Sequence, residues 1–342
     1  MSLYIGILII RIPYTYNFIV IFMNHLKVAY ACNDGYIMQT GISIISLLEN
    51  NNGFDNITIY LISKNISIEN INILDEIIKK YKRQLKVIEF EDIAYDLNIS
   101  QIGRHIETIY AKIFFSRIAG VDKMLYIDSD TIINGSLKKL WQENLEGFYM
   151  GMVETYTGGD AKKSLGLPIN SKFFNDGVAI VNVDYCRKNK LIEKCIAGIE
   201  YYHGNPPVLS EGLLNKVCNG KIKSISPRYN MMAGLHMYLS LSSEYMASKL
   251  SYDLNDLRES YRKPIIIHFL SGFYNRPWTD SCTHPLKNDF IKYKIISPWA
   301  DMPLIHSNLP FKIRFLGRLL KIVGPKKFDF IHKTVNYVNL QR

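Results

Sequence analysis

Lys123-Met-Leu-Tyr-Ile-Asp-Ser-Asp130 is a short apolar run that leads directly into two acidic residues one position apart. A run of this length and composition predicts a buried strand with polar groups at its carboxyl end. Open α/β sheets bind their ligands at that end, beside the point where the strand order reverses. The segment therefore predicts a sheet-based fold and the place of its ligand site.

The residues before this segment alternate between strand-like and helix-like stretches, which is typical of βαβ units. We expect strands at 27–32, 57–62 and 85–90, and helices at 36–48, 68–81 and 107–119. In the less regular second half we expect strands at 178–183 and 265–269, helices at 184–202 and 211–218, and a loop at 275–285. The predicted fold class is α/β, with a central, mostly parallel mixed sheet flanked by helices.

The composition is that of an ordinary globular protein. Of 342 residues, 48% are hydrophobic and 21% are charged, which argues against a disordered chain and against a multi-span membrane protein. The five cysteines are odd in number and form no Cys-x-x-Cys pair, so neither a disulfide framework nor a zinc ribbon is indicated. A reducing cytosol fits this cysteine usage best.

The two ends of the chain differ from the rest. Residues 1–22 are apolar, but Arg11, Pro13 and Asn17 interrupt the run, so we expect either a weak anchor or a translation start at Met23. Residues 301–342 form a basic amphipathic tail, in which the segment from Pro310 has eight basic residues and one acidic residue. That pattern predicts attachment to an anionic membrane surface, with packing of a helix on the main domain as the alternative.

Asp128 and Asp130 follow the apolar run so closely that their charges repel unless a counter-charge is present. A divalent cation such as Mn²⁺ or Mg²⁺ supplies that charge, since both prefer oxygen ligands and can neutralise a diphosphate. The alternative is a solvated acidic turn. His268 follows the apolar run Ile265-Ile-Ile267, so its ring is expected at a strand end, where a neutral nitrogen can bind a metal.

The longer segment Tyr126-Ile-Asp-Ser-Asp-Thr-Ile-Ile-Asn-Gly-Ser-Leu-Lys-Lys-Leu-Trp141 resembles the metal-binding segment of glycosyltransferase family 8. These are retaining enzymes that use nucleotide-sugar donors and include bacterial lipopolysaccharide galactosyl- and glucosyltransferases. Segments similar to other family motifs follow in the right order over roughly residues 25 to 300. The resemblance implies a GT-A type fold, a catalytic domain at 23–300, and a metal held by Asp128, Asp130 and His268.

Four further segments carry the resemblance and imply roles for their residues. Ala31-Cys-Asn-Asp-Gly-Tyr36 is similar to the loop whose aromatic ring stacks on uracil while an acidic or amide side chain reads the base edge. Thr108-Ile-Tyr-Ala-Lys112 is similar to a helix whose basic residue approaches the donor, and Phe173-Phe-Asn-Asp-Gly-Val178 to a segment that contacts the donor sugar. His268-Phe-Leu-Ser-Gly272 with Arg276-Pro-Trp278 resembles the region that supplies the third metal ligand and a diphosphate-binding base.

The implied donor- and cofactor-binding residues are Ala31, Asn33, Asp34, Tyr36, Lys112, Asp128, Ser129, Gly272 and Arg276, and the implied catalytic residues are Glu211, Asn175 and Asp176. Ser210-Glu211-Gly212 stands where family members often have an Asp-Gln-Asp-like stretch. A carboxylate at position 211 could stabilise an oxocarbenium-like transition state or attack the anomeric carbon, whereas its structural alternative is to start a helix. Relative to the family pattern, Lys112 stands in place of an arginine and Arg276 in place of a lysine. Both exchanges keep the charge but change the geometry of hydrogen bonds to phosphate.

The resemblance implies transfer of a hexose, glucose or galactose, from a UDP-sugar to a cell-surface glycan or glycolipid such as lipopolysaccharide. We expect the protein in the cytoplasm, on the inner face of the cytoplasmic membrane, and no nucleic-acid partner. Two alternatives remain at this point. Asp128-Ser-Asp-Thr131 also fits the nucleophile motif of haloacid-dehalogenase-like phosphatases, although that motif normally ends the first strand of its fold. A non-catalytic glycan- or membrane-surface binder on a transferase fold is the other.

Overall fold

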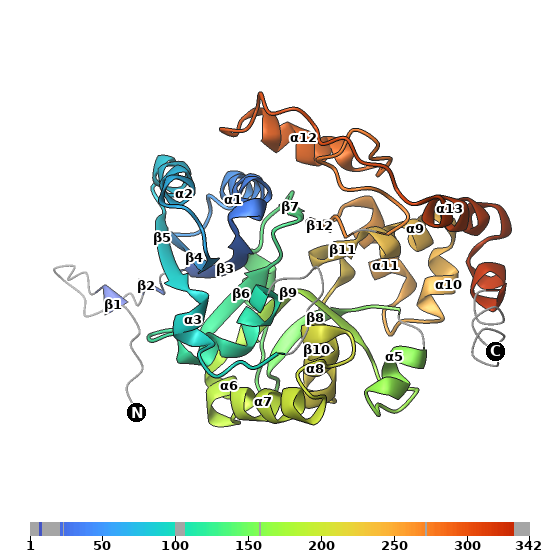
Figure 1. The fold of residues 1–342 in the computed structure, drawn as a ribbon, viewed down its shortest axis with the longest axis horizontal. Helices are drawn as coiled ribbons and strands as arrows, with labels where there is room; N and C mark the ends of the chain where they lie inside the picture. Colours follow the sequence, from blue (N-terminus) through green and yellow to red (C-terminus); the bar gives the residue numbers. More distant parts are fainter. Residues whose placement is uncertain are drawn as a thin grey trace, which may run out of the picture.

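A computed structural model describes residues 7–8, 21–22, 24–99, 107–156, 159–270 and 272–331. Its centre is a seven-stranded mixed sheet with the strand order β10-β8-β9-β6-β3-β4-β5 (Figure 1). The neighbouring strands are parallel except at β9, which runs antiparallel to both β6 and β8. The bounds are β3 (His25–Asn33), β4 (Asn56–Lys64), β5 (Gln84–Glu89), β6 (Lys123–Ile127), β8 (Met150–Glu154), β9 (Phe174–Asn182) and β10 (Ile222–Ser224).

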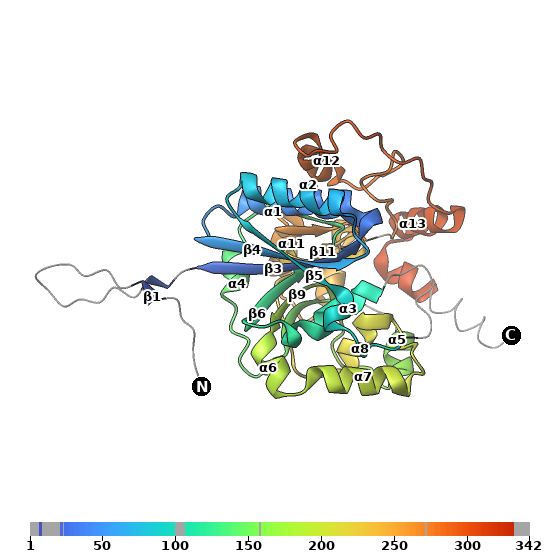
Figure 2. The same ribbon diagram turned by 60° about the vertical axis from the view of Figure 1, so that its left-hand side comes forward.

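Helices cover both faces of this sheet, as the alternating pattern predicts. α1 (Ile37–Asn50) and α2 (Ile68–Lys80) lie on one face, and α6 (Val183–Lys188) and α7 (Leu191–Tyr201) lie on the other (Figure 2). Side chains of β3 alternate between the two resulting cores, because successive residues of a strand point to opposite faces. Val28 packs with the α1 core and Ala29 with the core that contains α7, and both are fully buried.

A small second sheet has the strand order β11-β12-β7 and positions the predicted metal ligands. Its strands are β7 (Thr131–Ile133), β11 (Met231–Met232) and β12 (Ile266–His268). β12 runs antiparallel to β7, with His268 opposite Thr131. This pairing brings residues far apart in the sequence to the end of β6.

Three predicted elements differ from the structure. Residues 107–117 form a 3₁₀ helix, η2 (Glu107–Arg117), in place of an α-helix. The predicted helix at 184–202 is divided into α6 and α7, because Lys190 has a left-handed backbone with a φ of 54°. β9 begins at Phe174, so Asn175 to Gly177 lie inside a strand and not in a turn before it.

The C-terminal half adds helices α8 (Leu209–Val217), α9 (Ala233–Leu241), α10 (Ser243–Ala247), α11 (Leu254–Arg262) and α12 (Lys287–Ile295). The expected loop at 275–285 contains no helix or strand among its described residues. Past α12, the indole of Trp299 packs against α1 at Gly41, where a β-carbon would come within 2.3 Å of the ring. The shorter elements are η1 (Asp34–Tyr36), α3 (Phe90–Ile93), α4 (Lys138–Trp141), α5 (Gly159–Ser164) and η3 (Pro227–Tyr229).

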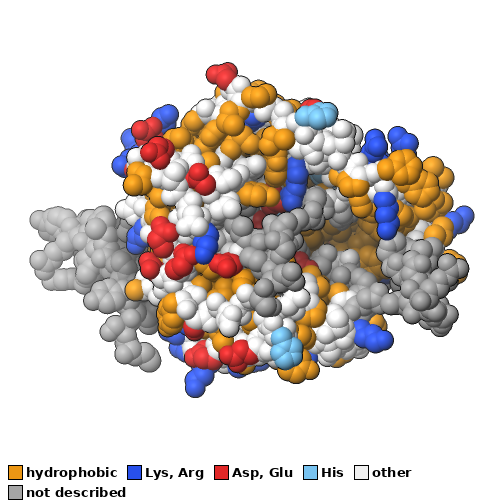
Figure 3. Space-filling model, viewed as in Figure 1, with side chains coloured by type: hydrophobic (Ala, Val, Ile, Leu, Met, Phe, Trp, Pro, Cys, Tyr) orange, Lys and Arg blue, Asp and Glu red, His pale blue; other side chains and the backbone are white. Residues whose placement is uncertain are grey.

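The basic tail forms α13 (Phe311–Val323) followed by a further helical stretch at 325–331. Leu320 is buried in a small cluster with Ala233 and Met237 of α9, so one face of α13 packs on the main domain. The other face exposes apolar and basic side chains, which lie together at one end of the molecule (Figure 3). Residues 332–342 of the expected tail are outside the described part.

The apolar extension is described at two places, β1 (Ile7–Leu8) and β2 (Ile21–Phe22), which pair as antiparallel strands. The rest of 1–22 lies outside the described residues. None of the helices in the described part of the chain has both the length and the apolar character needed to cross a bilayer. All five cysteines are free thiols.

Candidate active site

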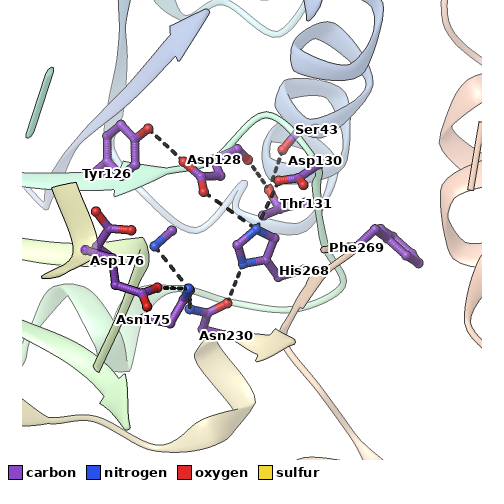
Figure 4. A network of polar contacts seen from close by, with 12 residues as sticks. Ser43, Tyr126, Asp128, Asp130, Thr131, Asn175, Asp176, Asn230, His268 and Phe269 are labelled. Atoms are coloured by element: carbon purple, nitrogen blue, oxygen red, sulfur yellow. Dashed lines mark hydrogen bonds and ion pairs between the residues drawn. The ribbon is translucent and has the colours of Figure 1, made fainter. Parts of the chain in front are cut away.

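Asp128, Asp130 and His268 converge at the junction of the two sheets (Figure 4). Nε2 of His268 lies 3.0 Å from Oδ1 of Asp130 and 3.6 Å from Oδ2 of Asp128. One ligand atom from each of the three residues lies within 4.8 Å of the other two. The sequence prediction that these residues meet is confirmed.

The three residues fit a divalent cation. His268 is fully buried, and its Nε2 points at the two carboxylates and has no other hydrogen-bond partner within the described part of the chain. Such an orphaned buried nitrogen is costly unless a ligand satisfies it. Two carboxylates and one imidazole suit Mn²⁺, and the carboxylates also suit Mg²⁺.

The backbone around the acidic turn is fixed by hydrogen bonds from three directions. Asp128 N–H donates to the carbonyl of Gly177 at 2.8 Å, and Phe269 N–H donates to the carbonyl of Asp130 at 2.9 Å. The hydroxyl of Tyr126 donates to Oδ1 of Asp128 at 2.7 Å. The carboxylates are therefore held in place by β9, β12 and β6 together.

The two carboxyls differ in their electrostatic surroundings. Burial raises the pKa of Asp128, and the nearby Lys112 and His268 offset this in part. Burial also opposes ionisation of Asp130, but His268 and Arg276 hold the pKa of Asp130 well below its usual range. Asp130 is thus the carboxylate that is more firmly ionised.

Arg276 lies against the metal-ligand cluster. Its Nη1 forms an ion pair with Oδ2 of Asp130, and its guanidinium lies 5.4 Å from the ring centre of Trp278. This basic group is therefore next to the predicted metal site, where the resemblance implies a diphosphate-binding residue.

A cleft of about 470 Å³ opens beside the cluster. Its walls contain most of the predicted site residues, namely Ala31, Tyr36, Lys112, Asp128, Ser129, Asp130, Asn175, Asp176, Glu211 and Arg276. Among the described residues the walls do not include Asn33, Asp34 or Gly272, and His268 lies buried behind the carboxylates. The cleft has room for a small ligand beside the metal ligands.

Lys112 is buried and forms an ion pair at the floor of the cleft, whereas a helical lysine is usually solvated. Its Nζ lies 2.9 Å from Oδ2 of Asp176, and only 2% of its side chain is exposed. Ser210 also donates to Asp176, at 2.7 Å. Lys112 is therefore the internal counter-ion of Asp176.

Glu211 reaches into the cleft from the first turn of α8. Its Oε2 accepts a hydrogen bond of 2.7 Å from Nδ2 of Asn175. Burial, together with the charge of Asp176, raises the pKa of Glu211 to about 8. The residue before the helix is Val208, whose φ is 57°, and Glu211 lies in the first turn of α8. Its structural alternative, to start a helix, therefore agrees with its position, although the side chain also reaches the cleft.

The predicted nucleotide loop is divided between the cleft and its surroundings. The ring of Tyr36 lines the cleft and meets the ring of Trp278 edge-on, with ring centres 6.4 Å apart. Asp34 faces away, because Oδ1 accepts hydrogen bonds of 2.8 Å from the backbone of Ser67 and the side chain of Asn70, at the start of α2. The side-chain oxygen of Asn33 is buried and has no hydrogen-bond partner among the residues that the structure describes.

Sequence analysis missed Asn230, which is fully buried and bonded to His268 and Asn175. Asn230 lies between η3 and β11 and belongs to no recognisable motif, so the surrounding sequence does not indicate a functional role for it. Thr40 was not predicted either, and its hydroxyl is hydrogen-bonded to that of Ser129 at 2.8 Å. The position of Thr40 on the apolar face of a predicted helix could have indicated that its hydroxyl has a buried partner.

Comparison with known proteins agrees with this geometry. General stress protein A of Bacillus subtilis is 23% identical over 280 residues, which cover 80% of this chain and 94% of that protein. A lipopolysaccharide 1,2-glucosyltransferase of Escherichia coli is 23% identical over 286 residues, covering 81% of this chain and 80% of that protein. The crystal structure of the galactosyltransferase LgtC has the same fold, with a TM-score of 0.67 and 20% identity over 85% of this chain and 99% of LgtC.

These matches leave no support for the phosphatase alternative, because the acidic motif here ends the fourth strand of a GT-A type sheet. The family described as Glycosyl transferase family 8 matches residues 27–282, well over half of the chain. The protein therefore belongs to glycosyl transferase family 8 and is a glycosyltransferase.

Proposed function

We propose that the protein is a metal-dependent, retaining hexosyltransferase that transfers glucose or galactose from a UDP-sugar to a cell-surface glycan such as lipopolysaccharide. The observation that carries this proposal is the orphaned Nε2 of His268, which faces Asp128 and Asp130 at the wall of an open cleft. Bound there, Mn²⁺ or Mg²⁺ supplies positive charge that stabilises the departing diphosphate.

The protein's own groups would hold the donor around that charge. The half-exposed ring of Tyr36 is available for stacking on the base, and Arg276 is placed to exchange its contact with Asp130 for the diphosphate. Lys112 supports the donor indirectly, since its charge is already paired with Asp176. Asn175 and Asp176 are the polar groups nearest to Glu211 and are proposed to contact the sugar.

Glu211 is proposed to act on the anomeric centre of the sugar. Its raised pKa means that much of it is protonated near neutral pH in the unliganded protein, and a protonated carboxyl is a poor nucleophile. This favours retention by front-face attack of the acceptor hydroxyl, with the departing phosphate taking the proton. Glu211 would then stabilise developing positive charge once ionised.

The acceptor and the location are inferred from the relatives and from the tail. The name of the Escherichia coli relative includes lipopolysaccharide, an acceptor at a membrane. The outer face of α13 exposes Phe311, Phe315 and Ile322 at 74%, 54% and 81% beside Arg314, Arg318 and Lys321. An exposed apolar stripe flanked by basic residues suits an anionic lipid surface, so we place the enzyme in the cytoplasm on the inner face of the cytoplasmic membrane.

The test is release of UDP from UDP-glucose and UDP-galactose, measured with Mn²⁺, with Mg²⁺ and with a chelator. We expect metal-dependent turnover that Asp130→Asn lowers about 100-fold or more, since Asp130 holds charge where it develops. Asp301→Asn, at an exposed position, is the matched control. Turnover that survives chelation would overturn the metal dependence. The absence of turnover with both nucleotide sugars would overturn the proposed transfer and favour a non-catalytic binder. An inverted anomeric product by NMR would overturn retention alone.

A further inference from the structure

A chain of hydrogen bonds connects the metal-ligand cluster to Glu211 through two buried amides. Figure 4 shows Asn230 between His268 and Asn175. Nδ1 of His268 lies 2.9 Å from Oδ1 of Asn230. Nδ2 of Asn230 donates to Oδ1 of Asn175 at 2.7 Å, and Nδ2 of Asn175 donates to Oε2 of Glu211 at 2.7 Å. Asn230 is fully buried and Asn175 is 7% exposed, so water does not substitute for these partners easily.

One backbone group fixes the direction of this chain. The N–H of Gly177 can only donate, and it points at Oδ1 of Asn175 at 3.2 Å. The amide of Asn175 must therefore present its oxygen to Gly177, and the group of Asn230 that meets the same oxygen must be its NH₂. The carbonyl oxygen of Asn230 consequently faces Nδ1 of His268, which must carry a proton in order to donate to it.

We propose that Asn230 is a positioning residue that holds the neutral ring of His268 in its Nδ1–H tautomer. The lone pair of the ring then lies on Nε2, which faces Asp128 and Asp130 and, among the described residues, has no partner besides these carboxylates. Through Asn175 the same residue keeps Glu211 directed into the cleft. A metal-binding histidine needs such a partner on its other nitrogen to fix its ring orientation and tautomer.

The role of Asn230 in metal binding rests on the proposed metal-dependent function. The first test, which concerns the tautomer alone, needs no metal. In metal-free protein at a pH where the ring is neutral, the ¹⁵N NMR shifts of the His268 ring should show the proton on Nδ1. In Asn230→Leu, which is similar in shape and cannot accept, the ring should lose this preference. A wild-type ring protonated on Nε2 would overturn the inference without any variant.

The second test measures the affinity for Mn²⁺, with and without UDP. The EPR signal of the unbound ion reports how much Mn²⁺ remains free. Loss of the group that orients a metal-binding histidine commonly weakens metal binding about 10- to 100-fold, and we expect this for Asn230→Leu. Asn175→Asp still accepts from Gly177 and Asn230 but cannot donate to Glu211. It should therefore keep the Mn²⁺ affinity and the tautomer while kcat falls.

Asn51→Leu is the matched control, because Asn51 is likewise buried, at 2% exposed, and is bonded on both sides, to the backbone of Leu47 and Leu137, away from the cleft. It should lower stability without changing the His268 tautomer or Mn²⁺ binding. Folded Asn230→Leu that binds Mn²⁺ as tightly as the wild type would overturn the inference. Wild-type protein that binds no Mn²⁺ would instead overturn the proposed metal-dependent function.

Discussion

A β-carbon added at Gly177 would lie 2.3 Å from Cε1 of His268 and 2.6 Å from Oδ2 of Asp128. Contacts this short require atoms to move, and both neighbours belong to the metal-ligand cluster. Glycine is therefore needed at position 177 because there is no room for a side chain behind the cluster. Sequence analysis attributed the Asn-x-Gly segment to close approach of the sugar, whereas the structure shows this additional packing reason.

Gly177→Ala should displace the ring of His268 and reduce metal-dependent turnover while the protein stays folded. Overpacking of this kind costs about 1–3 kcal/mol of stability. Urea unfolding and a Mn²⁺ titration of UDP release would measure the two effects. Gly53→Ala is the control, since a β-carbon there meets nothing within 4 Å, and equal Mn²⁺ requirements in the two variants would contradict the prediction.

Lys112→Met should destabilise the protein by about 3–5 kcal/mol, because it leaves the carboxylate of Asp176 buried without its counter-ion. Replacing both partners, in Lys112→Met with Asp176→Asn, should recover part of the loss. Free energies of unfolding in urea provide the comparison. Lys79→Met removes an exposed ion pair with Asp75 and should cost about 0.5 kcal/mol or less. A Lys112→Met change of similar size would show that the buried pair contributes little.

His236 and His284 predict a loss of stability in acid. Burial lowers the pKa of His236 to about 4, and burial with the neighbouring His236 lowers the pKa of His284 to about 3. The unfolded chain, with ordinary histidine pKa values near 6.5, then binds protons that the folded protein does not, so stability is complete above that pH and falls as the pH drops toward 3.

At pH 4 the expected loss from His236 alone is on the order of 3 kcal/mol. His236→Phe should flatten the dependence of unfolding free energy on pH between 6.5 and 4, since Tyr261 and His284 provide an aromatic surrounding. Identical slopes for the wild type and His236→Phe would refute this account.

The outer face of α13 should bind vesicles that contain anionic lipids. Changing Arg314, Arg318 and Lys321 to Gln should weaken binding by about 3 kcal/mol, at roughly 1 kcal/mol for each basic residue near the lipid. Changing Phe311, Phe315 and Ile322 to Ser should weaken it further on the same vesicles. Ile68→Ser, at a 72% exposed site on α2, is the control in vesicle sedimentation.

These substitutions are preferable to deletion of the tail. Leu320 packs on α9, so deletion from residue 311 would uncover Ala233 and Met237 as well as remove the basic face. Sedimentation that is unchanged in both triple variants, with circular dichroism like that of the wild type, would dismiss the membrane proposal.

The metal-ligand cluster could be predicted from the sequence because each member follows an apolar strand. Asp128 and Asp130 directly follow β6, and His268 is the last residue of β12. The ends of strands are where a sheet gathers its polar groups. The first four strands of the large sheet were predicted for the same reason. The runs of β3, β4 and β6 are largely buried on both faces and are therefore continuous in the sequence, whereas β5 lies at the edge of the sheet and is mostly exposed.

Other parts could not be predicted, because they depend on contacts between distant segments. Lys112 lies in a helical segment, where solvation is the usual state, and only its neighbour Asp176 makes its burial tolerable. Asp34 belongs to the expected nucleotide loop, but the start of α2 offers it three hydrogen bonds. The 3₁₀ geometry of η2 and the interruption at Lys190 are likewise set by packing, which residue patterns do not record.

The indole of Trp299 on Gly41 ties the segment after α12 to the helix that follows Tyr36 in the cleft. Six residues further on, the backbone of Ile305 bonds to Trp278 and Asp280, beyond the expected catalytic limit at residue 300. Anyone who trims the chain for crystallisation should therefore keep it at least through Ile305. A cut at 300 would remove the backbone hydrogen bonds that Ile305 makes to the loop that carries Arg276.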